Sequence, residues 1–315
     1  MAAASLAGAI LVAAWLDRRF GEPGNGWHPV AWLGRLLAVL GRPLPDWRPA
    51  LAFGAGALLW SAVIVGVGWL AWRLQLVLLS LPFWLAVPLL ALALKPTFAW
   101  RMLRDEVAAV DAALSTGGIV AGRERLARLC SRDVTTLDET AVRETAIESL
   151  AENLNDSLVA PLFWVVIAGL PGAWAWRAAN TMDAMWGYRD HREWAGKWAA
   201  RADDVLAWLP ARLTALLLWR PGVGLAPLKH EAALTPSPNG GWPMATMALR
   251  LGVRLGKPGV YRLNAGGRAA DARSVREALA AARAAAWLAF AAAAVAVLVS
   301  GLVATGSMGS MRSMP

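Results

Sequence analysis

A chain of 315 residues that is 57% hydrophobic and only 17% charged is too apolar for an ordinary soluble domain. Its net charge of +9 does not indicate nucleic-acid binding, because no nucleic-acid-binding motif accompanies the charge. The single cysteine, Cys130, excludes an internal disulfide and a zinc site built from several thiolates.

The apolar residues are gathered in long runs. Residues 1–16 form a short one, which we interpret as an uncleaved anchor or a partly buried helix rather than a signal peptide. Arg73 alone separates the next two runs and predicts a tight helical hairpin there. Four charge-free runs are long enough to cross a hydrocarbon core about 30 Å thick, namely residues 50–72, 74–94, 157–176 and 284–306. We therefore expect an all-α, polytopic membrane protein with about five spans and a helical polar region between them, without strands.

Two polar segments differ in charge. Residues 95–157 hold eight Lys and Arg against eleven Asp and Glu, and they favour helices interrupted at Gly117-Gly118. Residues 220–283 hold ten Lys and Arg against three Asp and Glu, and they are expected to be rich in loops, with an Arg-rich helix at 268–283. Cytoplasmic loops collect basic residues, so this region is expected to face the cytoplasm; binding of an anionic substrate or lipid head groups is a second use. We expect one integral-membrane domain, 1–315, with a helical insertion and a basic loop region.

The stretch from Arg132 to Asp156 is the most informative part of the chain. Carboxylates recur there at every fourth residue: Glu144, Glu148, Glu152 and Asp156. A helix would place all four on one face, where like charges repel, and no Lys or Arg is interposed on that face. We expect this helix to receive a cation or a positively charged partner rather than to be a solvated face without function.

Prolines interrupt two apolar stretches. Pro171 lies in residues 157–176, and Pro210 lies in residues 205–219. Such interruptions in membrane segments are typical of re-entrant or broken helices near a site. If both stretches are re-entrant or tilted, the loop 177–204 faces the same side as the two polar segments, and if both span, it faces the other. We expect the first arrangement.

Polar clusters in a fixed order resemble the CobD/CbiB family of cobalamin biosynthesis, whose members are membrane adenosylcobinamide-phosphate synthases. The resemblance covers about residues 15–265 and is carried by GEPGNGWHPV (21–30), RDVTTLDE…ESLAENLNDS (132–157), NTMDAMWGYR (180–189), SPNGGWPM (237–244) and GVRLGKPGVYRL (252–263). Glu22 departs from the pattern, since the family more usually has Asp before the proline.

The resemblance implies an amide ligation. A propionate carboxylate of adenosylcobyric acid would be joined to (R)-1-amino-2-propanol O-phosphate, or to aminopropanol, with ATP and Mg²⁺, to give adenosylcobinamide phosphate or adenosylcobinamide. It implies a multi-pass protein of the inner, cytoplasmic membrane with its active site facing the cytoplasm. The expected partners are the corrinoid, the aminopropanol phosphate and membrane lipid, together with a second copy of the chain or other enzymes of the pathway.

Activation of a carboxylate by phosphoryl transfer needs hard oxygen ligands for Mg²⁺ and basic groups for the phosphates. The sequence contains no P-loop, so the nucleotide site would be non-standard. We expect catalytic roles for Glu148, Glu152, Asp183 and Arg189. We expect the nucleotide and substrates to be bound by Arg132, Arg143, His28, Asn180 and Asn239. We expect the metal ion to be bound by Asp133, Glu148, Glu152 and Asp156.

The re-entrant arrangement adds a geometric expectation, that Asp183 lies within about 20 Å of Glu152, less than the thickness of the hydrocarbon core. Two functions of other classes remain open. One is a transporter or channel whose broken helices line a substrate path. The other is a non-catalytic membrane scaffold that gathers soluble enzymes of the corrinoid pathway. The lack of an inverted repeat, and charged clusters that lie mostly in loops, speak against the transporter.

Overall fold

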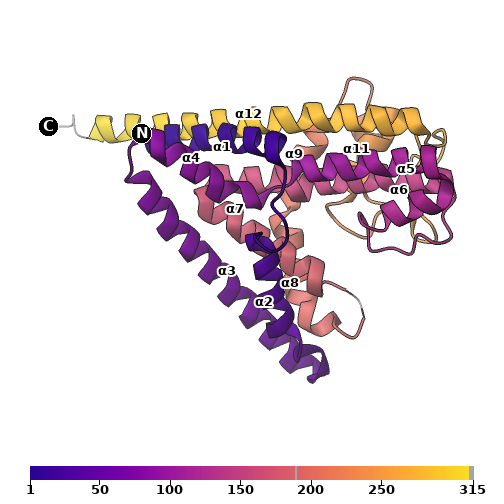
Figure 1. Cartoon of the computed structure of the whole chain (residues 1–315), viewed down its shortest axis with the longest axis horizontal. Helices are drawn as coiled ribbons and strands as arrows, with labels where there is room; N and C mark the ends of the chain where they lie inside the picture. Colours follow the sequence, from indigo (N-terminus) through magenta and orange to yellow (C-terminus); the bar gives the residue numbers. More distant parts are fainter. Residues whose placement is uncertain (189, 312–315) are drawn as a thin grey trace. The chain divides into compact units, whose positions relative to one another are not determined.

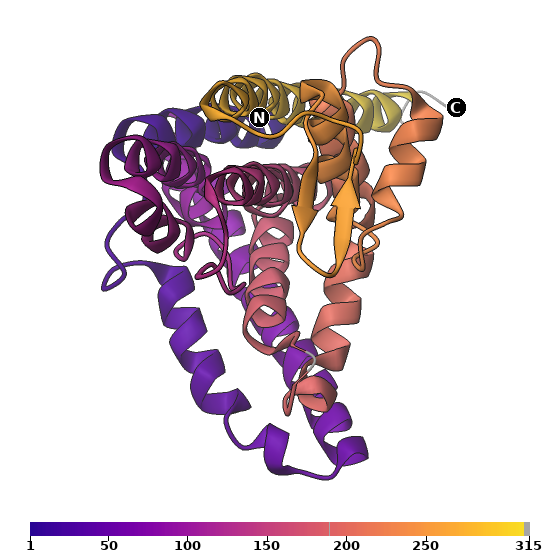
Figure 2. The ribbon, with the colours of Figure 1, turned by 90° about the vertical axis from the view of Figure 1, so that its right-hand side faces the viewer.

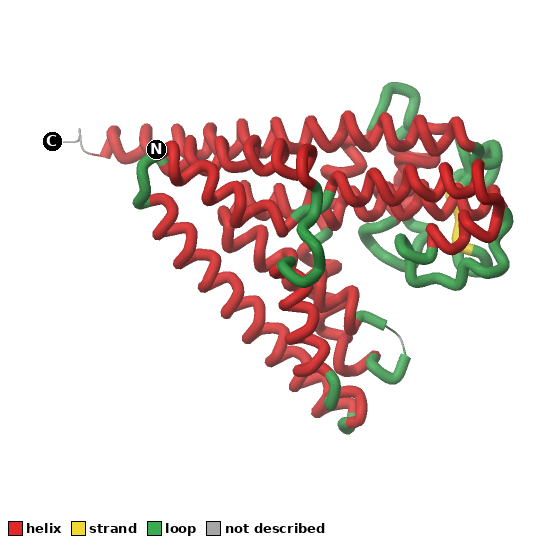
Figure 3. The backbone as a smooth tube through the Cα atoms, in the orientation of Figure 1, coloured by secondary structure: helices red, strands yellow, loops and turns green. Residues whose placement is uncertain are grey.

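The computed structural model describes residues 1–188 and 190–311 (Figure 1), and nearly all their regular structure is helical (Figure 3). The first elements are α1 (Ala2–Phe20), α2 (Pro29–Gly41), η1 (Leu44–Asp46), α3 (Pro49–Leu79), α4 (Phe83–Leu94), η2 (Lys95–Thr97), α5 (Trp100–Leu126) and α6 (Glu139–Leu154). They are followed by η3 (Asn155–Val159), α7 (Ala160–Trp186), α8 (Glu193–Leu206), α9 (Trp208–Leu218), α10 (Leu225–Ala232), α11 (Gly241–Leu251), β1 (Leu255–Lys257), β2 (Tyr261–Leu263) and α12 (Ala272–Met311). The all-α class is confirmed.

The chain divides into two compact units, each assembled from separate stretches of sequence. The first contains residues 1–99, 160–205 and 289–315, and the second contains Trp100–Val159 and Leu206–Leu288. The charge-free runs of α3 and α4 belong to the first unit. The acidic segment after residue 99 and the whole basic region 220–283 belong to the second, so two polar stretches far apart in the chain fold together.

Three helical segments of the described residues are long and apolar enough to cross a membrane: Pro49–Leu79, Glu139–Trp186 and Ala272–Val303. A fourth span results if Phe83–Thr97 and Trp100–Leu126 are counted as one broken helix. These are fewer than the five spans expected. The run 74–94 is divided between the end of α3 and α4, whose 12 residues extend about 18 Å and are too short to cross alone. The stretch at 205–219, which was not expected to be a plain span, contributes only the 11 residues of α9.

The predicted hairpin at Arg73 is wrong in position. Helix α3 continues through Arg73 to Leu79, and the turn lies at residues 80–82, before Pro82 caps α4. A single arginine does not end an apolar helix, because its long side chain reaches away from the apolar surface. Here the Arg73 guanidinium lies 6.0 Å from the ring centre of Trp72.

In the first unit, α3 packs along α7 and α1 packs along α4 (Figure 1). Helix α7 is broken at Gly169, whose φ of 67° few other residues adopt, two positions before Pro171. The backbone N–H of Leu170, left without a helical partner, donates to the Gln75 side-chain oxygen of α3 at 2.7 Å. The interruption expected from the proline is therefore present, and a neighbouring helix satisfies the exposed backbone, as membrane depth requires.

In the second unit, α11 packs against α9, α10 and α6. The short antiparallel hairpin of β1 and β2 also packs on α6 and α11; Figure 2 shows it as two arrows. Residues 220–283 are thus more ordered than the predicted loop region, and the expectation of no strands is wrong for this hairpin. Strands of three residues are too short to show alternation, and their turn depends on Gly259 at a φ of 72°. The Arg-rich helix expected at 268–283 is confirmed as the start of α12.

Candidate functional site

The carboxylate stripe is helical, as expected from its spacing. Asp138 is the N-cap of α6, and its carboxylate accepts a hydrogen bond from the backbone N–H of Ala141 at 2.8 Å. Three members of the stripe, Glu144, Glu148 and Glu152, occupy successive turns of α6. The fourth, Asp156, lies in η3, a single π-helical turn of the kind that is frequent at functional sites.

The cations that offset this repulsion come from outside the helix. The Arg132 guanidinium lies 3.0 Å from the Glu148 carboxylate, whose side chain is only 1% exposed. Arg254, just before β1, lies 3.2 Å from the Glu144 carboxylate. The expectation that at least two members of the stripe contact a cationic group is confirmed, although the sequence of the helix did not show which cations they meet.

A phenol completes the buried part of this cluster. Tyr261 of β2 lies beside Glu148, and burial together with the negative charge of Glu148 raises the pKa of its hydroxyl. The phenol therefore stays protonated and can donate a hydrogen bond. Burial opposes the positive charge of Arg132, but the Glu148 carboxylate outweighs it and raises the pKa of the guanidinium. The three side chains form a carboxylate–guanidinium–phenol cluster, which we call the Glu148 cluster.

A pocket of about 480 Å³ lies between α6 and the hairpin. The charged side chains of its wall include Glu144, Arg254, Lys257 and Arg262, and Tyr261 joins it to the Glu148 cluster. The wall also contains Asp138, so three basic groups outnumber two carboxylates, and this excess of positive charge suits a polyanionic ligand. Sequence reasoning missed all of these basic residues and Tyr261, although the motif GVRLGKPGVYRL, which contains them, was the available signal.

The segment SPNGGWPM meets the carboxyl-terminal end of the same stripe. A Cβ atom on Gly240 would lie 2.8 Å from a carboxylate oxygen of Glu152, so only glycine allows this close approach. The neighbouring Asn239 is buried, and its side-chain oxygen accepts a hydrogen bond from Arg212 at 2.8 Å. Glu148, Glu152 and Asn239, expected in one site on grounds of chemistry, therefore lie in one compact unit.

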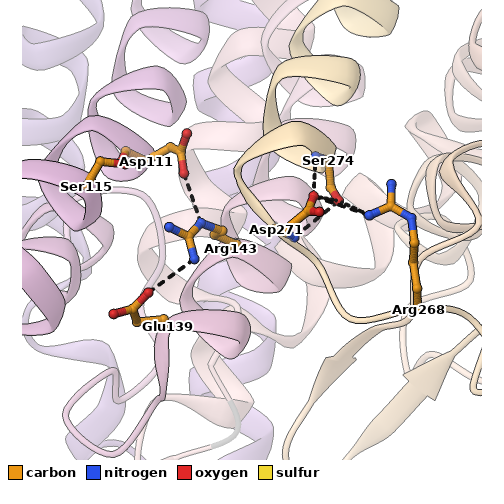
Figure 4. Close-up of polar contacts among 7 residues, drawn as sticks. All are labelled: Asp111, Ser115, Glu139, Arg143, Arg268, Asp271 and Ser274. Atoms are coloured by element: carbon orange, nitrogen blue, oxygen red, sulfur yellow. Dashed lines mark hydrogen bonds and ion pairs between the residues drawn. The ribbon is translucent and has the colours of Figure 1, made fainter.

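Other expected site residues have local structural partners. Arg143 joins α6 to α5 by an ion pair with Asp111 at 2.9 Å and also contacts Glu139 at 3.3 Å (Figure 4). Its guanidinium is thus engaged between two helices and does not line the pocket. Asp133 is exposed, and its carboxylate accepts hydrogen bonds from the backbone and hydroxyl of Thr135 at 2.9 and 2.7 Å.

The expected metal ligands do not gather into one centre. Within residues 1–188 and 190–311, no three His, Cys, Asp or Glu side chains are close enough together to hold a metal ion. The physical reasons are local, because Asp133 bonds to its own turn, Glu148 pairs with Arg132, and Asp156 accepts a hydrogen bond from the side chain of Asn155 at 2.8 Å. The binding of a metal ion by Asp133, Glu148, Glu152 and Asp156 stays a prediction.

The GEPGNGWHPV motif builds a second charged cluster, in the first unit. The backbone N–H of Val30 donates to Nδ1 of His28 at 3.2 Å, so His28 caps α2, and its Nε2 lies 2.8 Å from Glu22. Glu22 also forms an ion pair with Lys95, which lies 3.1 Å from Asp17. Burial acts to raise the pKa of Glu22, but the hydrogen bond from His28 and the charge of Lys95 lower it overall. We call these four residues the Lys95 cluster.

The Lys95 cluster changes the interpretation of His28. Both ring nitrogens are engaged by protein groups, so this side chain positions the motif rather than offering a free ring to a nucleotide. Lys95 was missed by sequence reasoning. A lone lysine at the end of the apolar run 74–94 was the only signal, and its two carboxylate partners lie far away in the chain.

Two of the remaining expected residues, Asn180 and Asp183, lie on α7. Asn180 and Asp183 are one turn apart near its carboxyl-terminal end, where a pocket of about 390 Å³ is lined by Tyr188, Lys197 and Asp204, among others. Arg189 lies outside the described residues. Asp183 belongs to the first unit and Glu152 to the second, so the expectation that their loops share one site stays a prediction.

Fold and site define a polytopic helical membrane protein with a polar unit that buries a carboxylate–guanidinium–phenol cluster beside a basic pocket. The family model described as CobD/Cbib protein matches residues 10–289. The chain belongs to this family of cobalamin biosynthesis proteins, and the resemblance inferred from its motifs is confirmed.

Three relatives illustrate the match. The chain is 42% identical over 254 residues to a probable cobalamin biosynthesis protein CobD of Thermococcus kodakarensis, which covers 80% of this chain and 83% of the relative. It is 40% identical to the cobalamin biosynthesis protein CobD of Chromobacterium violaceum, over 78% of this chain and 80% of the relative. It is 34% identical to a probable CobD of Methanocaldococcus jannaschii, over 82% and 88%. No solved structure matches the chain.

Proposed function

We propose that this protein is the amide-forming ligase of its pathway, joining a propionate of adenosylcobyric acid to aminopropanol O-phosphate, or to aminopropanol, at the expense of ATP. The observation that carries the proposal is the Glu148 cluster, set beside a pocket with three basic side chains. Such a site combines groups for proton transfer and oxyanion stabilisation with groups for a polyphosphate. Its location in a member of a cobalamin biosynthesis family supports the choice of substrates.

The chemistry divides into two steps. In the first step, a propionate oxygen attacks the terminal phosphorus of ATP, and the bond between that phosphorus and the bridging oxygen breaks. The products are an acyl phosphate and ADP. The amine nitrogen then attacks the carbonyl carbon, the C–N bond forms, inorganic phosphate leaves, and the nitrogen loses a proton. Both steps develop negative charge on oxygen, which preorganised donors stabilise.

The side chains can be given roles in these steps. Arg254, Lys257 and Arg262 bind the triphosphate, since the pocket offers these cations together. Tyr261 donates a hydrogen bond to an oxygen that gains charge, and Glu152, next to Gly240, accepts the amine proton. One or two carboxylates of the stripe would hold a Mg²⁺ ion bound to the nucleotide, which would neutralise charge on the phosphates.

The direct test is an assay with membranes that contain the protein. Adenosylcobyric acid, Mg-ATP and either aminopropanol phosphate or aminopropanol are supplied, and the amide product is sought by mass. We expect product that depends on every component, and the better amine identifies the natural substrate. A transporter would accumulate corrinoid without the amide, and a scaffold would bind corrinoid without turnover. Either result contradicts the proposal.

We further propose that the protein lies in the inner membrane with the second unit facing the cytoplasm, where ATP is available. The basic excess of residues 220–283 supports this orientation. Cys130 alone is a poor reporter, because burial raises the pKa of its thiol. Ser131→Cys in a Cys130→Ser background places a thiol at an exposed neighbouring position. An impermeant maleimide is expected to label it only after permeabilisation, whereas labelling of intact cells would reverse the orientation.

A further inference from the structure

A second basic pocket lies where α9 and α11 end and α12 begins. Its volume is about 770 Å³, and its charged lining consists of Arg220, Arg250, Arg268, Arg273, Asp271 and Glu277. None of these residues lines the pocket between α6 and the hairpin. Four guanidinium groups and two carboxylates give this pocket a net charge of +2.

Two of the four arginines are neutralised within the protein. Arg268 lies 3.2 Å from Asp271 and 3.5 Å from Glu277, and Arg273 lies 2.8 Å from Glu277. Asp271 also caps α12, accepting hydrogen bonds from the backbone and hydroxyl of Ser274 at 2.8 and 2.6 Å (Figure 4). Both carboxylates of the pocket are therefore engaged by these partners.

Arg220 and Arg250 have no carboxylate partner among residues 1–188 and 190–311. One N–H of Arg250 donates to the backbone oxygen of Leu218 at 2.7 Å, at the end of α9, which leaves its other donors available. Burial and the charge of Arg220 lower the pKa of Arg250, so the two cations are close enough to repel each other. An anion between them would relieve that repulsion.

The surroundings indicate the kind of anion. From Glu277, at the pocket, to the charge-free stretch of α12 that begins at residue 284 is about 10 Å along the helix. Trp219, beside Arg220, and Trp287, on α12, are 45% and 39% exposed, as is typical of tryptophans at a membrane interface. Phosphate groups occur at that level, and guanidinium groups bind phosphate through paired hydrogen bonds.

We propose that Arg220 and Arg250 form a phosphate-binding site separate from the proposed nucleotide pocket. Its ligand carries a phosphate ester or free phosphate, supplied either by the head group of an anionic phospholipid or by a soluble molecule. The site does not depend on the ligase proposal, since none of its residues has a role in that reaction.

The test uses the purified full-length protein in neutral detergent, with inorganic phosphate as the first probe and phosphatidylglycerol against phosphatidylcholine in mixed micelles as the second. Binding is measured by calorimetry and by the shift of the melting temperature. Arg220→Gln is expected to weaken binding about tenfold, the loss of one charge-assisted pair of hydrogen bonds. Arg220 is exposed and pairs with no carboxylate, so this variant is expected to fold; Arg250→Gln is the companion.

Arg276→Gln is the matched control, because it removes an equal charge from the exposed surface of α12 outside the pocket lining. A response to phosphatidylglycerol alone identifies a lipid site, and a response to inorganic phosphate identifies a site for a soluble ligand. The proposal is overturned if neither probe binds the unaltered protein, or if Arg276→Gln weakens binding as much as Arg220→Gln does.

Discussion

Glu148→Gln is expected to reduce amide formation at least about 100-fold, the scale on which a charge-stabilising or proton-transferring group acts. The substitution keeps the size of a side chain that is 1% exposed but removes the charge that holds Arg132 and faces Tyr261. The measurement is the rate of product formation by membranes, normalised to the amount of protein in the membrane. Glu152→Gln is expected to have a comparable effect through the amine proton.

Loss of a buried charge also costs stability, so the controls separate folding from chemistry. Glu139→Gln is the matched control on α6, because its side chain is 58% exposed and contacts Arg143 at the surface, outside the Glu148 cluster. Arg132→Gln combined with Glu148→Gln removes both charges and should restore the melting temperature without restoring activity. Activity retained in both Glu148→Gln and Glu152→Gln would contradict the assignment of the stripe as catalytic.

Lys95→Met is expected to have the largest effect on stability, lowering the free energy of unfolding by about 3–5 kcal/mol. The lysine is the cation between the buried carboxylate of Asp17 and the half-buried carboxylate of Glu22, and its removal takes the Lys95 ion pair away from both. The measurement is thermal unfolding in detergent, together with the amount of protein recovered from membranes.

The matched control for this change removes the carboxylates as well. Asp17→Asn and Glu22→Gln combined with Lys95→Met leave no uncompensated charge, and most of the lost stability should return. If Lys95→Met alone melts like the unaltered protein, the Lys95 cluster does not hold the first unit together. If the Lys95→Met variant is stable but inactive, Lys95 has a role in the reaction rather than in stability.

Local spacing was enough to predict several elements correctly. The fourfold repeat of carboxylates predicted the helix α6, and Gly117-Gly118 predicted an interruption, found at Gly118 with a φ of 72° inside α5. The composition predicted a helical membrane protein, and the ordered motifs predicted its family. These features depend on residues within a few turns of one another or on the chain's overall chemistry, which the sequence states directly.

Only tertiary structure decided which charges meet. Glu144 is paired with Arg254, 110 positions away, and Glu22 with Lys95, 73 positions away. Arg143 also has its partner on another helix, since its guanidinium lies against Asp111 of α5. An ion pair depends on which segments pack together, and charge spacing along one helix cannot identify a partner from another.

For the membrane segments too, the sequence predicted some features and only the packing decided others. Pro171 predicted an interruption in α7, but the means of satisfying the open backbone came from Gln75 on α3. The number of spans was overestimated because hydropathy does not show where a helix ends: α3 takes up the start of the run 74–94, and the 12 residues of α4 are too short to cross alone. The short α9 is apolar because it packs against α11 inside the second unit. Apolar residues favour burial in protein and in lipid alike, so the sequence predicted that these segments avoid water, and only the packing showed which of them do so within the protein.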